Sequence, residues 1–367
     1  MLRSEYVLIL LWIGAMDLIQ RFVKTDHLEW TDGRMEIRCN WLFAFLTFFP
    51  VLLMAAHRDN IGDSFAYAKT FAQMPGTFSG FLEYLNTSGK DWAFFALTAF
   101  IKAAVSGDQR VYFLIIAAVQ GLILVGIYRK YSISYVTSVF LFIASSDYIS
   151  WMFNGIRQFT AVTIIFAGTG WMLERKHIRV ILLIFVASQF HASALLMIPI
   201  YLIAQGRAWN GRTILFIMLA VLAVLFADRF TDIIEYLLTD TQYGNVVMDY
   251  RGFNDNGTSP LRALIYSVPA VFAFMGRKAI ERTNNPLINL CTNMSLITAG
   301  LYLISVFTSG IFIGRLPIYT SLYGYMLLPW EINYLYRDRS RFMVYLLMIL
   351  FYIALYYYQM HISWGLF

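Results

Sequence analysis

Two stretches of this chain carry no charged residue over about the length that a helix needs to cross a lipid bilayer. They are residues 111–127, VYFLIIAAVQGLILVGI, and 342–358, FMVYLLMILFYIALYYY. A helix that crosses the hydrocarbon core needs roughly 17–25 apolar residues. Because lipid offers no hydrogen-bond partner, every backbone polar group must be satisfied inside its own segment, which favours helices. The sequence therefore predicts an all-α integral membrane protein, built as a polytopic helical bundle.

The composition agrees with this class and argues against two others. The 367 residues are 59% hydrophobic and only 14% charged, which is more apolar surface than a water-soluble chain of this length can bury. The net charge is +6, but Lys and Arg stand in short clusters between apolar runs, so we expect no nucleic-acid partner. The two cysteines, Cys39 and Cys291, indicate neither a disulfide framework nor a metal site.

Basic residues predict the orientation, because Lys and Arg concentrate in the cytoplasmic loops of membrane proteins. The clusters are Arg21/Lys24/Arg34/Arg38, Arg129/Lys130, Arg175/Lys176/Arg179, Arg207/Arg212, Arg277/Lys278/Arg282 and Arg337/Arg339/Arg341. Placing all of them in the cytoplasm requires about ten full spans, with both termini outside. The predicted spans are residues 5–22, 40–56, 111–127, 133–151, 157–173, 213–228, 260–275, 287–307, 317–335 and 342–360.

Two apolar segments must not cross singly if this alternation is to close. Residues 93–105 are short and contain Lys102, so we expect an interfacial or re-entrant helix. Residues 180–205 begin and end beside basic clusters, which predicts a hairpin of two short helices with its turn near 189–193. A limb of about 12 residues, rising about 1.5 Å per residue, reaches about 18 Å. His191 in the turn is therefore expected to lie below the outer membrane surface.

The remaining polar stretches fall outside the membrane in this arrangement. We expect one membrane domain over residues 1–367, with external loops near 57–110 and 229–259 and a short one at 309–316. The apolar N-terminal run is interpreted as a retained first helix, because no basic stretch precedes it and no small-residue cleavage site follows it. No internal repeat divides the chain.

Two arginines at the outer ends of predicted spans are candidates for binding phosphate. Arg157 opens the span at 157–173 and Arg315 stands in the short external loop, each without an obvious partner in the sequence. Arginine at the outer side opposes the positive-inside tendency, and its guanidinium suits bidentate phosphate recognition. The alternative is a side chain that reaches the interface without a ligand. We expect both to face one cavity and to bind the pyrophosphate of a donor.

Three groups on the predicted external side compete for the role of general base: His191, Asp63 and His57. A histidine and a carboxylate can both accept a hydroxyl proton at neutral pH. His191 is favoured because a turn inside the membrane boundary fixes its geometry, whereas His57 and Asp63 lie in or beside a polar loop. We expect Arg157 nearby to keep the imidazole neutral by charge repulsion. The structural alternative for His191 is a histidine that caps a half-helix. For His57 and Asp63 it is a solvated loop with internal ion pairs.

Three motifs together resemble a known family. R-D-N-I-G-D at 58–63 is followed by Tyr67, N-G-I-R-Q-F-T-A at 154–161 opens a mid-chain helix, and F-H-A-S-A-L follows at 190–195. Their order, and the spacing of spans over nearly the whole chain, is similar to the EpsG family of exopolysaccharide polymerases, which belongs with the Wzy-type O-antigen polymerases. The R-Q pair and the H-x-S-A motif are the most specific part. The chain departs from the family at Gly62-Asp63-Ser64, where Gly-Thr-Asp-Thr is common.

The resemblance implies a GT-C-like glycosyltransferase of the bacterial inner membrane, with its active site facing the periplasm or outside. Its donor would be a glycan on polyprenyl pyrophosphate, and its acceptor the non-reducing-end hydroxyl of a second lipid-linked repeat unit. Membrane lipid and a chain-length regulator protein are the further partners that we expect. Arg58, Tyr67 and Gln158, which stand in the matching motifs, are expected to bind substrate or pyrophosphate.

We expect neither a cofactor nor a metal ion, and the resemblance implies the same. No D-x-D pair and no His/Cys cluster at ligand spacing is present on the predicted external side. Arginines would then replace a cation in stabilising the leaving pyrophosphate.

Functions of other classes compete with polymerisation. A ligase that moves a finished chain onto another lipid would use the same donor and leaving group. A flippase would move lipid-linked oligosaccharides without chemistry, but such transporters typically show two related halves, and this chain shows no duplication. A membrane O-acyltransferase could use His191 as its base, but it needs an acyl-donor site that the sequence does not show.

Overall fold

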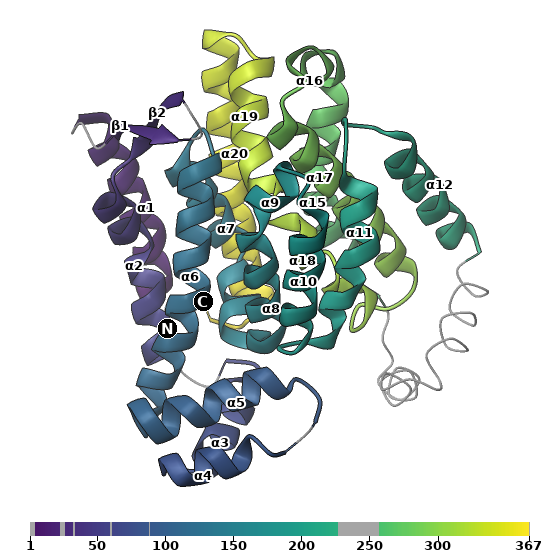
Figure 1. Cartoon of the computed structure of the whole chain (residues 1–367). Helices are drawn as coiled ribbons and strands as arrows, with labels where there is room; N and C mark the ends of the chain where they lie inside the picture. Colours follow the sequence, from purple (N-terminus) through teal and green to yellow (C-terminus); the bar gives the residue numbers. More distant parts are fainter. Residues whose placement is uncertain are drawn as a thin grey trace. The chain divides into compact units, whose positions relative to one another are not determined.

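The computed structural model describes residues 4–22, 26–31, 34–58, 61–87, 89–226 and 257–366. The chain divides into two compact units, whose elements are labelled in Figure 1. Unit 1 consists of Met1–Leu195 together with Tyr336–Phe367, and unit 2 consists of Leu196–Leu335. The sequence pattern, which we interpreted as one membrane domain, contains no signal for this division.

Unit 1 contains helices and one short β-hairpin. Its first elements are α1 (Ser4–Phe22), β1 (Asp26–Thr31), β2 (Arg34–Cys39), α2 (Trp41–His57), α3 (Ser64–Gln73), α4 (Phe78–Tyr84), α5 (Trp92–Phe100) and its π-helical continuation η1 (Ile101–Val105). The next are α6 (Gln109–Tyr131), α7 (Tyr135–Ala144), the π-helix η2 (Tyr148–Asn154), α8 (Ile156–Ala167), α9 (Thr169–Leu173), α10 (His177–Ser188) and the 3-10 helix η3 (Ala192–Leu196). The C-terminal elements are α20 (Asp338–Tyr358) and the π-helix η5 (Gln359–Ser363).

The packed pair α2 and α6 shows how the sequence sets the direction of the helices in unit 1. Asn40 caps the first turn of α2 and Asp108 caps the first turn of α6, each with a side-chain oxygen that accepts a backbone N–H. Near the end of α6, Arg129 Nε donates to the carbonyl oxygen of Cys39 at 2.7 Å, just before α2 begins. The two helices therefore run antiparallel.

Basic clusters lie together within each unit. In unit 1, Arg38 Nη1 donates to the carbonyl oxygen of Lys130, and Glu174, at the start of the cluster at 175–179, interacts electrostatically with Lys130. In unit 2, the Arg277 guanidinium lies 5.8 Å from the ring centre of Trp209, between the basic residues 207 and 212. Clusters that the positive-inside rule assigns to one membrane side are therefore neighbours in the fold.

Unit 2 is helical throughout its described residues. Its elements are α11 (Met197–Ala204), α12 (Gly211–Leu225), α15 (Pro260–Met275), α16 (Arg277–Thr283), α17 (Pro286–Phe307), the 3-10 helix η4 (Ile313–Arg315), α18 (Ile318–Ser321) and α19 (Gly324–Leu335). The long α17 starts at Pro286 after Asn285, whose side chain accepts two backbone N–H groups of the first turn. Helices α11, α12, α15, α18 and α19 all pack against α17, which forms the centre of the unit.

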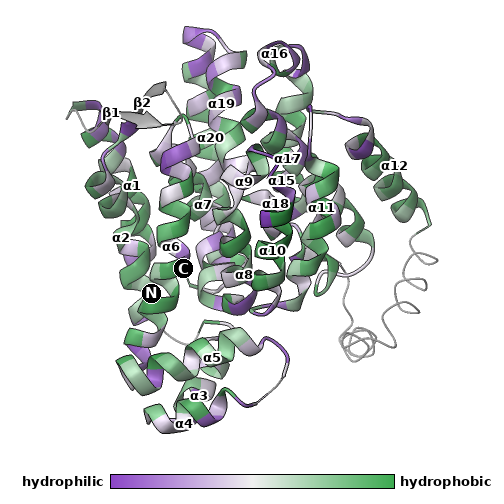
Figure 2. Ribbon diagram, in the orientation of Figure 1, coloured by the Kyte–Doolittle hydropathy of each residue, from purple (hydrophilic) through white to green (hydrophobic). Residues whose placement is uncertain are grey.

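Apolar helices make up most of the described chain, and Figure 2 shows α1, α2 and α6 green along most of their lengths. By length and composition, three helices among the described residues could cross a membrane: Gln109–Tyr131, Pro286–Phe307 and Asp338–Ser363. The number rises to five if each of two sharply bent helix pairs forms one span. Shorter apolar helices of 10–17 residues accompany them. These findings support a membrane protein, while about ten spans and a GT-C-like architecture stay predictions.

The predicted span at 133–151 is not one continuous helix. Helix α7 ends at Ala144, and η2 continues after a bend of 77°. Ser146, in the break, has a φ of 56°, in the left-handed region that non-glycine residues rarely adopt. The three consecutive polar residues at 145–147 explain the break, because Ser and Asp side chains compete with helical backbone hydrogen bonds. The predicted spans at 157–173 and 317–335 are also interrupted, at Gly168 and at 322–323.

The connection between the first two predicted spans forms a β-hairpin, so the chain is not strictly all-α. Strands β1 and β2 pair antiparallel, with Asp26 opposite Cys39 and Thr31 opposite Arg34. The signal in the sequence is Asp32-Gly33 between two runs of alternating character, a pattern typical of tight hairpins. The predicted loop near 57–110 is largely helical, and the loop near 229–259 lies outside the described residues up to position 256.

Candidate functional site

The end of the first motif, at Gly62 and Asp63, is fixed onto the start of the second. Asn154 Oδ1 accepts a hydrogen bond of 2.6 Å from the backbone N–H of Asp63, and Ser64 Oγ donates to the carbonyl oxygen of Phe153 at 3.0 Å. Gly62 has a φ of 53°, and a Cβ there would lie 2.1 Å from Asn154 Oδ1. The turn therefore needs glycine both for its conformation and for space. Asp63 itself is exposed.

Arg58 points into unit 1 rather than into solvent. Its Nη1 donates to the carbonyl oxygen of Met152 at 3.0 Å, and its guanidinium carbon lies 3.6 Å from the ring centre of Phe113. Burial lowers the pKa of Arg58 to about 9, so the guanidinium keeps its charge at neutral pH. The buried Nε has no hydrogen-bond partner among the described residues. A cation is thus held at the apolar boundary of the site.

Arg157, at the start of α8, forms an ion pair that the sequence did not predict. Its Nη1 donates to Asp91 Oδ2 at 2.7 Å, and Tyr67 is a second hydrogen-bonding neighbour of the guanidinium. The Arg157 side chain is 33% exposed, whereas that of Asp91 is fully buried. Arg157 can therefore still meet a ligand from outside while one edge of its guanidinium is held. Arg157 therefore has a partner, Asp91, that was not obvious from the sequence.

Asp91 is the residue that sequence reasoning missed. It precedes α5 in the left-handed conformation, with a φ of 56°, and lies outside the predicted spans. Burial raises the pKa of its carboxyl, while Arg157 and the backbone N–H of Ala192 oppose this rise. Oδ1 is buried without a hydrogen-bond partner in the described part of the chain. Nothing in the polar stretch around Lys90 and Asp91 distinguishes it from a solvated loop.

The helix at 180–205 is broken at His191, as predicted. Helix α10 ends at Ser188 and η3 starts at Ala192. His191 Nδ1 lies 2.7 Å from Ser193 Oγ, within hydrogen-bonding distance. The carbonyl oxygen of Gln189 accepts a hydrogen bond of 3.0 Å from the N–H of Ala93 at the start of α5. The break therefore excludes one unbroken helix, while the return of the chain as a hairpin stays a prediction, because α11 belongs to unit 2.

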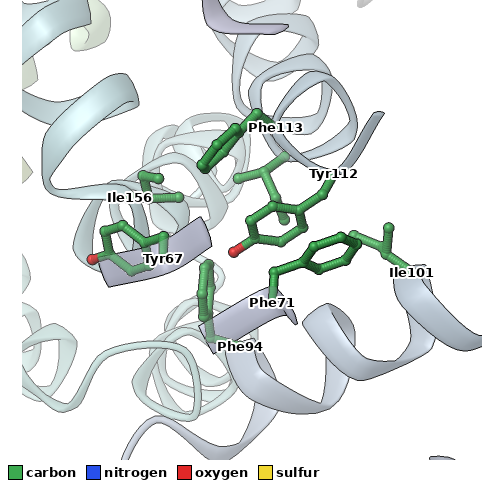
Figure 3. Close-up of a cluster of buried hydrophobic side chains, with 8 residues drawn as sticks. Tyr67, Phe71, Phe94, Ile101, Tyr112, Phe113 and Ile156 are labelled. Atoms are coloured by element: carbon green, nitrogen blue, oxygen red, sulfur yellow. The ribbon is translucent and has the colours of Figure 1, made fainter. Parts of the chain in front are cut away.

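An aromatic cluster supports these groups from within unit 1. Its buried members are Tyr67, Phe71, Phe94, Ile101, Tyr112, Phe113, Ile116 and Ile156 (Figure 3). In Figure 3 the hydroxyl of Tyr112 points toward Tyr67, and the hydroxyl of Tyr67 points away from the cluster. Phe190, beside His191, packs against the same cluster. The ring of Tyr67 is thus anchored in apolar contacts while its hydroxyl reaches Arg157.

The structure brings together most of the predicted site residues. Arg58, Asp63, Tyr67, Arg157 and His191 all belong to unit 1 and are linked through the contacts of Asn154, Asp91 and Ala192. Gln158 is buried on α8.

Two further expectations concern Arg315 and the charge next to His191. Arg315 is exposed on η4 of unit 2, so its joint action with Arg157 stays a prediction. The expected repulsion between Arg157 and His191 is weakened, because Asp91 neutralises the arginine.

Comparison with protein families settles what kind of chain this is. The model of the EpsG family matches residues 41–365. The chain belongs to the EpsG family. The match includes the candidate site residues of unit 1 and the whole of unit 2, and the known class of the EpsG family is the Wzy-type polymerases. No curated protein and no solved structure matches the chain.

The described residues of this EpsG-family protein provide no cluster of side chains that suits a metal ion. Among the described residues, no group of three or more His, Cys, Asp or Glu side chains is arranged to hold a metal ion. Cys39 and Cys291 are both buried, and neither is part of a disulfide. The charged groups of the site are instead the two arginines 58 and 157 and the carboxylates 63 and 91. Metal independence stays a prediction.

Proposed function

We propose that this EpsG-family protein polymerises lipid-linked oligosaccharide repeat units on the outer face of the bacterial inner membrane. Membership of the family supports polymerisation, and the arrangement of unit 1 supports the place of the site. The observation that carries the proposal is the half-exposed Arg157, held by Asp91 and Tyr67 next to the chain break that contains His191. This arrangement offers the guanidinium of Arg157, held by its partners, beside His191 as a candidate general base.

The reaction joins two lipid-linked glycans. The acceptor hydroxyl attacks the anomeric carbon of the donor sugar, the bond from this carbon to the pyrophosphate oxygen breaks, and polyprenyl pyrophosphate leaves. Arg157 stabilises the charge that develops on the leaving group, with Arg58 and Arg315 as further candidates. Because Asp91 already occupies Nη1, the phosphate would use the remaining N–H groups of Arg157.

His191 takes the proton of the acceptor hydroxyl in this proposal. Ser193 Oγ lies beside Nδ1, and a hydrogen bond from Nδ1–H to this oxygen selects the tautomer in which Nε2 accepts a proton. Asp63 is the second candidate, because its backbone is fixed while its carboxylate is exposed. Tyr67 and Gln158 are proposed to position substrate from α3 and α8.

Incubation of the purified protein with its lipid-linked repeat unit, followed by sizing of the glycan, tests the reaction. A ladder of products is expected, and the same ladder in EDTA is expected for a metal-independent enzyme. A single transfer to a different lipid would identify a ligase, an acylated glycan an acyltransferase, and an unchanged substrate a transporter. Each of these three results would overturn polymerisation.

A further inference from the structure

Unit 2 has a basic surface for which the proposed reaction has no use. Its exposed basic side chains come from two segments that are distant in the sequence, and they are Arg207, Arg212, Arg277, Lys278 and Arg282. The only acidic residue within 205–215 and 276–286 is Glu281, which pairs with Arg277 at 2.7 Å. Five basic side chains and one acidic side chain leave these two segments with a net charge of +4.

The two basic segments meet in the fold. The guanidinium carbon of Arg277 lies 5.8 Å from the ring centre of Trp209, within the range of a cation–π interaction. Trp209 stands between Arg207 and Arg212 in a tight turn and has a φ of 54°. Nη2 of Arg212 donates to the carbonyl oxygen of Gln205, where this turn begins. The basic groups of the two segments therefore belong to one surface.

Side-chain amides of α17 hold the turn in place. Asn289 Oδ1 accepts a hydrogen bond of 3.1 Å from the N–H of Ala208, and Asn293 Oδ1 accepts one of 3.1 Å from the N–H of Trp209. Asn293 Nδ2 also donates to the carbonyl oxygen of Arg207 at 3.1 Å, and Asn293 is fully buried. The backbone that presents the basic side chains is therefore fixed, so a ligand meets it without having to order it.

Helix α16 changes direction where its basic residues begin. It is bent by 71° from α15 at Gly276, where a Cβ would lie 2.5 Å from the side chain of Leu335. Because α15 lies in the predicted span 260–275, a helix bent this far from it is expected to lie near the membrane plane, at the level of the lipid head groups. Ile280 is fully buried, whereas Lys278 and Arg282 are exposed, and Figure 2 shows α16 largely purple.

Exposed apolar side chains border the basic surface. They are Phe274 and Met275 at the end of α15, and Ile214 and Leu215 at the start of α12. Each pair lies within three residues of an exposed arginine. Basic groups beside exposed hydrocarbon suit a ligand that has a negative charge at the end of an apolar chain. A free anion would use the basic groups alone and would leave the apolar residues without a partner.

We propose that this surface binds the head group of an anionic phospholipid. Arg207, Lys278 and Arg282 form no ion pair within the described part of the chain, so these three groups are available to a phosphate. The lipid phosphate accepts hydrogen bonds from the basic side chains, and the acyl chains lie against the apolar residues at the ends of α12 and α15. The site does not rest on the polymerisation reaction proposed for unit 1.

Titration of the purified protein in detergent with phosphatidylglycerol, measured by native mass spectrometry, tests this site. Phosphatidylcholine with the same acyl chains is the probe without net charge, and the wild type should bind phosphatidylglycerol at least about tenfold more tightly. Arg207→Gln/Arg282→Gln should weaken the binding of phosphatidylglycerol by at least about tenfold, because it removes two of the groups that attract the anionic lipid. Arg207→Lys/Arg282→Lys keeps both charges and should lose less.

A matched control separates this site from a general attraction between lipid and basic residues. Arg337→Gln/Arg339→Gln removes two exposed arginines from the basic cluster at the start of α20 and should keep nearly the wild-type affinity. Equal losses in the two Gln variants would overturn the site, as would wild-type affinity in Arg207→Gln/Arg282→Gln or equal binding of the two lipids by the wild type. Complete competition by inorganic phosphate would also overturn it, because the ligand would then be a free anion.

Discussion

In the described part of the chain, unit 1 contains two buried carboxyl groups, Asp91 and Asp147, and unit 2 contains one, Glu331. Asp91 and Glu331 differ in what compensates their charge. In unit 1, Asp91 meets Arg157 at 2.7 Å, and in unit 2, Glu331 meets no cation among the described residues. Removing a partner from a buried ion pair leaves an uncompensated charge, whereas a neutral buried carboxyl needs only a hydrogen bond or a bound ion. The difference indicates that Arg157 compensates the charge of Asp91, whereas an ionised Glu331 would be an uncompensated buried charge.

The surroundings of the two carboxyl groups also indicate different roles for the two units. Arg157 is partly exposed, so the pair in unit 1 has one face available for an anionic substrate. Glu331 is fully buried, so the carboxyl group in unit 2 has no exposed face for a substrate. Substitutions of Arg157, Asp91 and Glu331 therefore test this difference between the units.

The largest effect is expected for Arg157→Ala, which turns Asp91 into a second unpaired carboxyl. We expect a loss of about 3 kcal/mol in the free energy of unfolding at neutral pH, at the lower end for a buried pair because Arg157 is partly exposed. Polymer formation should fall at least about 100-fold, because the leaving pyrophosphate loses a cation. Denaturant unfolding in detergent measures the first effect, and glycan sizing measures the second.

The pH dependence of Arg157→Ala follows from the sign of the shift at Asp91. Burial raises the pKa of Asp91 above its unfolded value, and the loss of Arg157 removes the largest charge that opposes this rise. A carboxyl with a raised pKa stabilises the fold below its unfolded pKa, and this stabilisation is lost as the pH rises through the folded pKa. The variant should therefore regain stability in acid, and Arg157→Ala/Asp91→Asn should regain it at neutral pH. An Arg157→Ala variant as stable as wild type at neutral pH contradicts the ion pair.

The next effect is expected at His191, the proposed general base, which has no equivalent in the comparison. His191→Ala should reduce turnover by about 10²- to 10⁴-fold, the usual contribution of a general base. Binding of the lipid-linked donor, measured separately, should stay nearly unchanged. Ser193→Ala, which removes only the neighbour of Nδ1, is the control and should cost much less. Polymerisation at close to the normal rate in His191→Ala would make Asp63 the next candidate.

A smaller effect is expected for Asp91→Asn. The amide cannot carry the charge that faces Arg157, but the arginine can reach water, so we expect a loss of about 1–2 kcal/mol in the free energy of unfolding. Asp91→Glu should retain the ion pair and lose less, because it keeps the carboxylate. Comparison of the two variants by denaturant unfolding separates the charge from the shape of the side chain. Equal losses in both would mean that shape, and not charge, is what Asp91 contributes.

The sequence motifs were sufficient to indicate residues that the structure brings together in unit 1, but not to indicate their partners. Arg58, Tyr67, Arg157 and His191 stand in motifs with unusual charges at apolar boundaries, and the structure places them in one unit. Asp91 could not be predicted, because its burial depends on contacts with α8 and η3, which are distant in the sequence. A polar stretch with no periodicity gives no information about such contacts.

The fold shows the same limit. Helix ends marked by Asn or Asp caps, such as those of α2 and α6, are local features that the sequence contains. The bend of 77° after α7 also has a local cause, the polar residues 145–147, but a search for spans treats them as part of one apolar run. The division into two units has no local cause at all, because it depends on which helices pack together. Glu331 was visible as a charge inside a predicted span, but its missing partner was not.

The smallest effect is expected for Glu331→Gln, and it is the most direct test of the comparison with Asp91→Asn. At mildly acidic pH, an uncharged Glu331 and a glutamine have the same shape. The free energy of unfolding should then change by less than about 0.5 kcal/mol, whereas Asp91→Asn destabilises under the same conditions. As the pH rises, the wild type must either keep a proton on Glu331 or carry an uncompensated buried charge, so Glu331→Gln should become the more stable of the two proteins. Parallel denaturant titrations of both amide variants at two pH values measure this difference. If Glu331→Gln loses as much stability as Asp91→Asn at every pH, then Glu331 is an ionised and paired carboxyl like Asp91, and the contrast between the units does not exist.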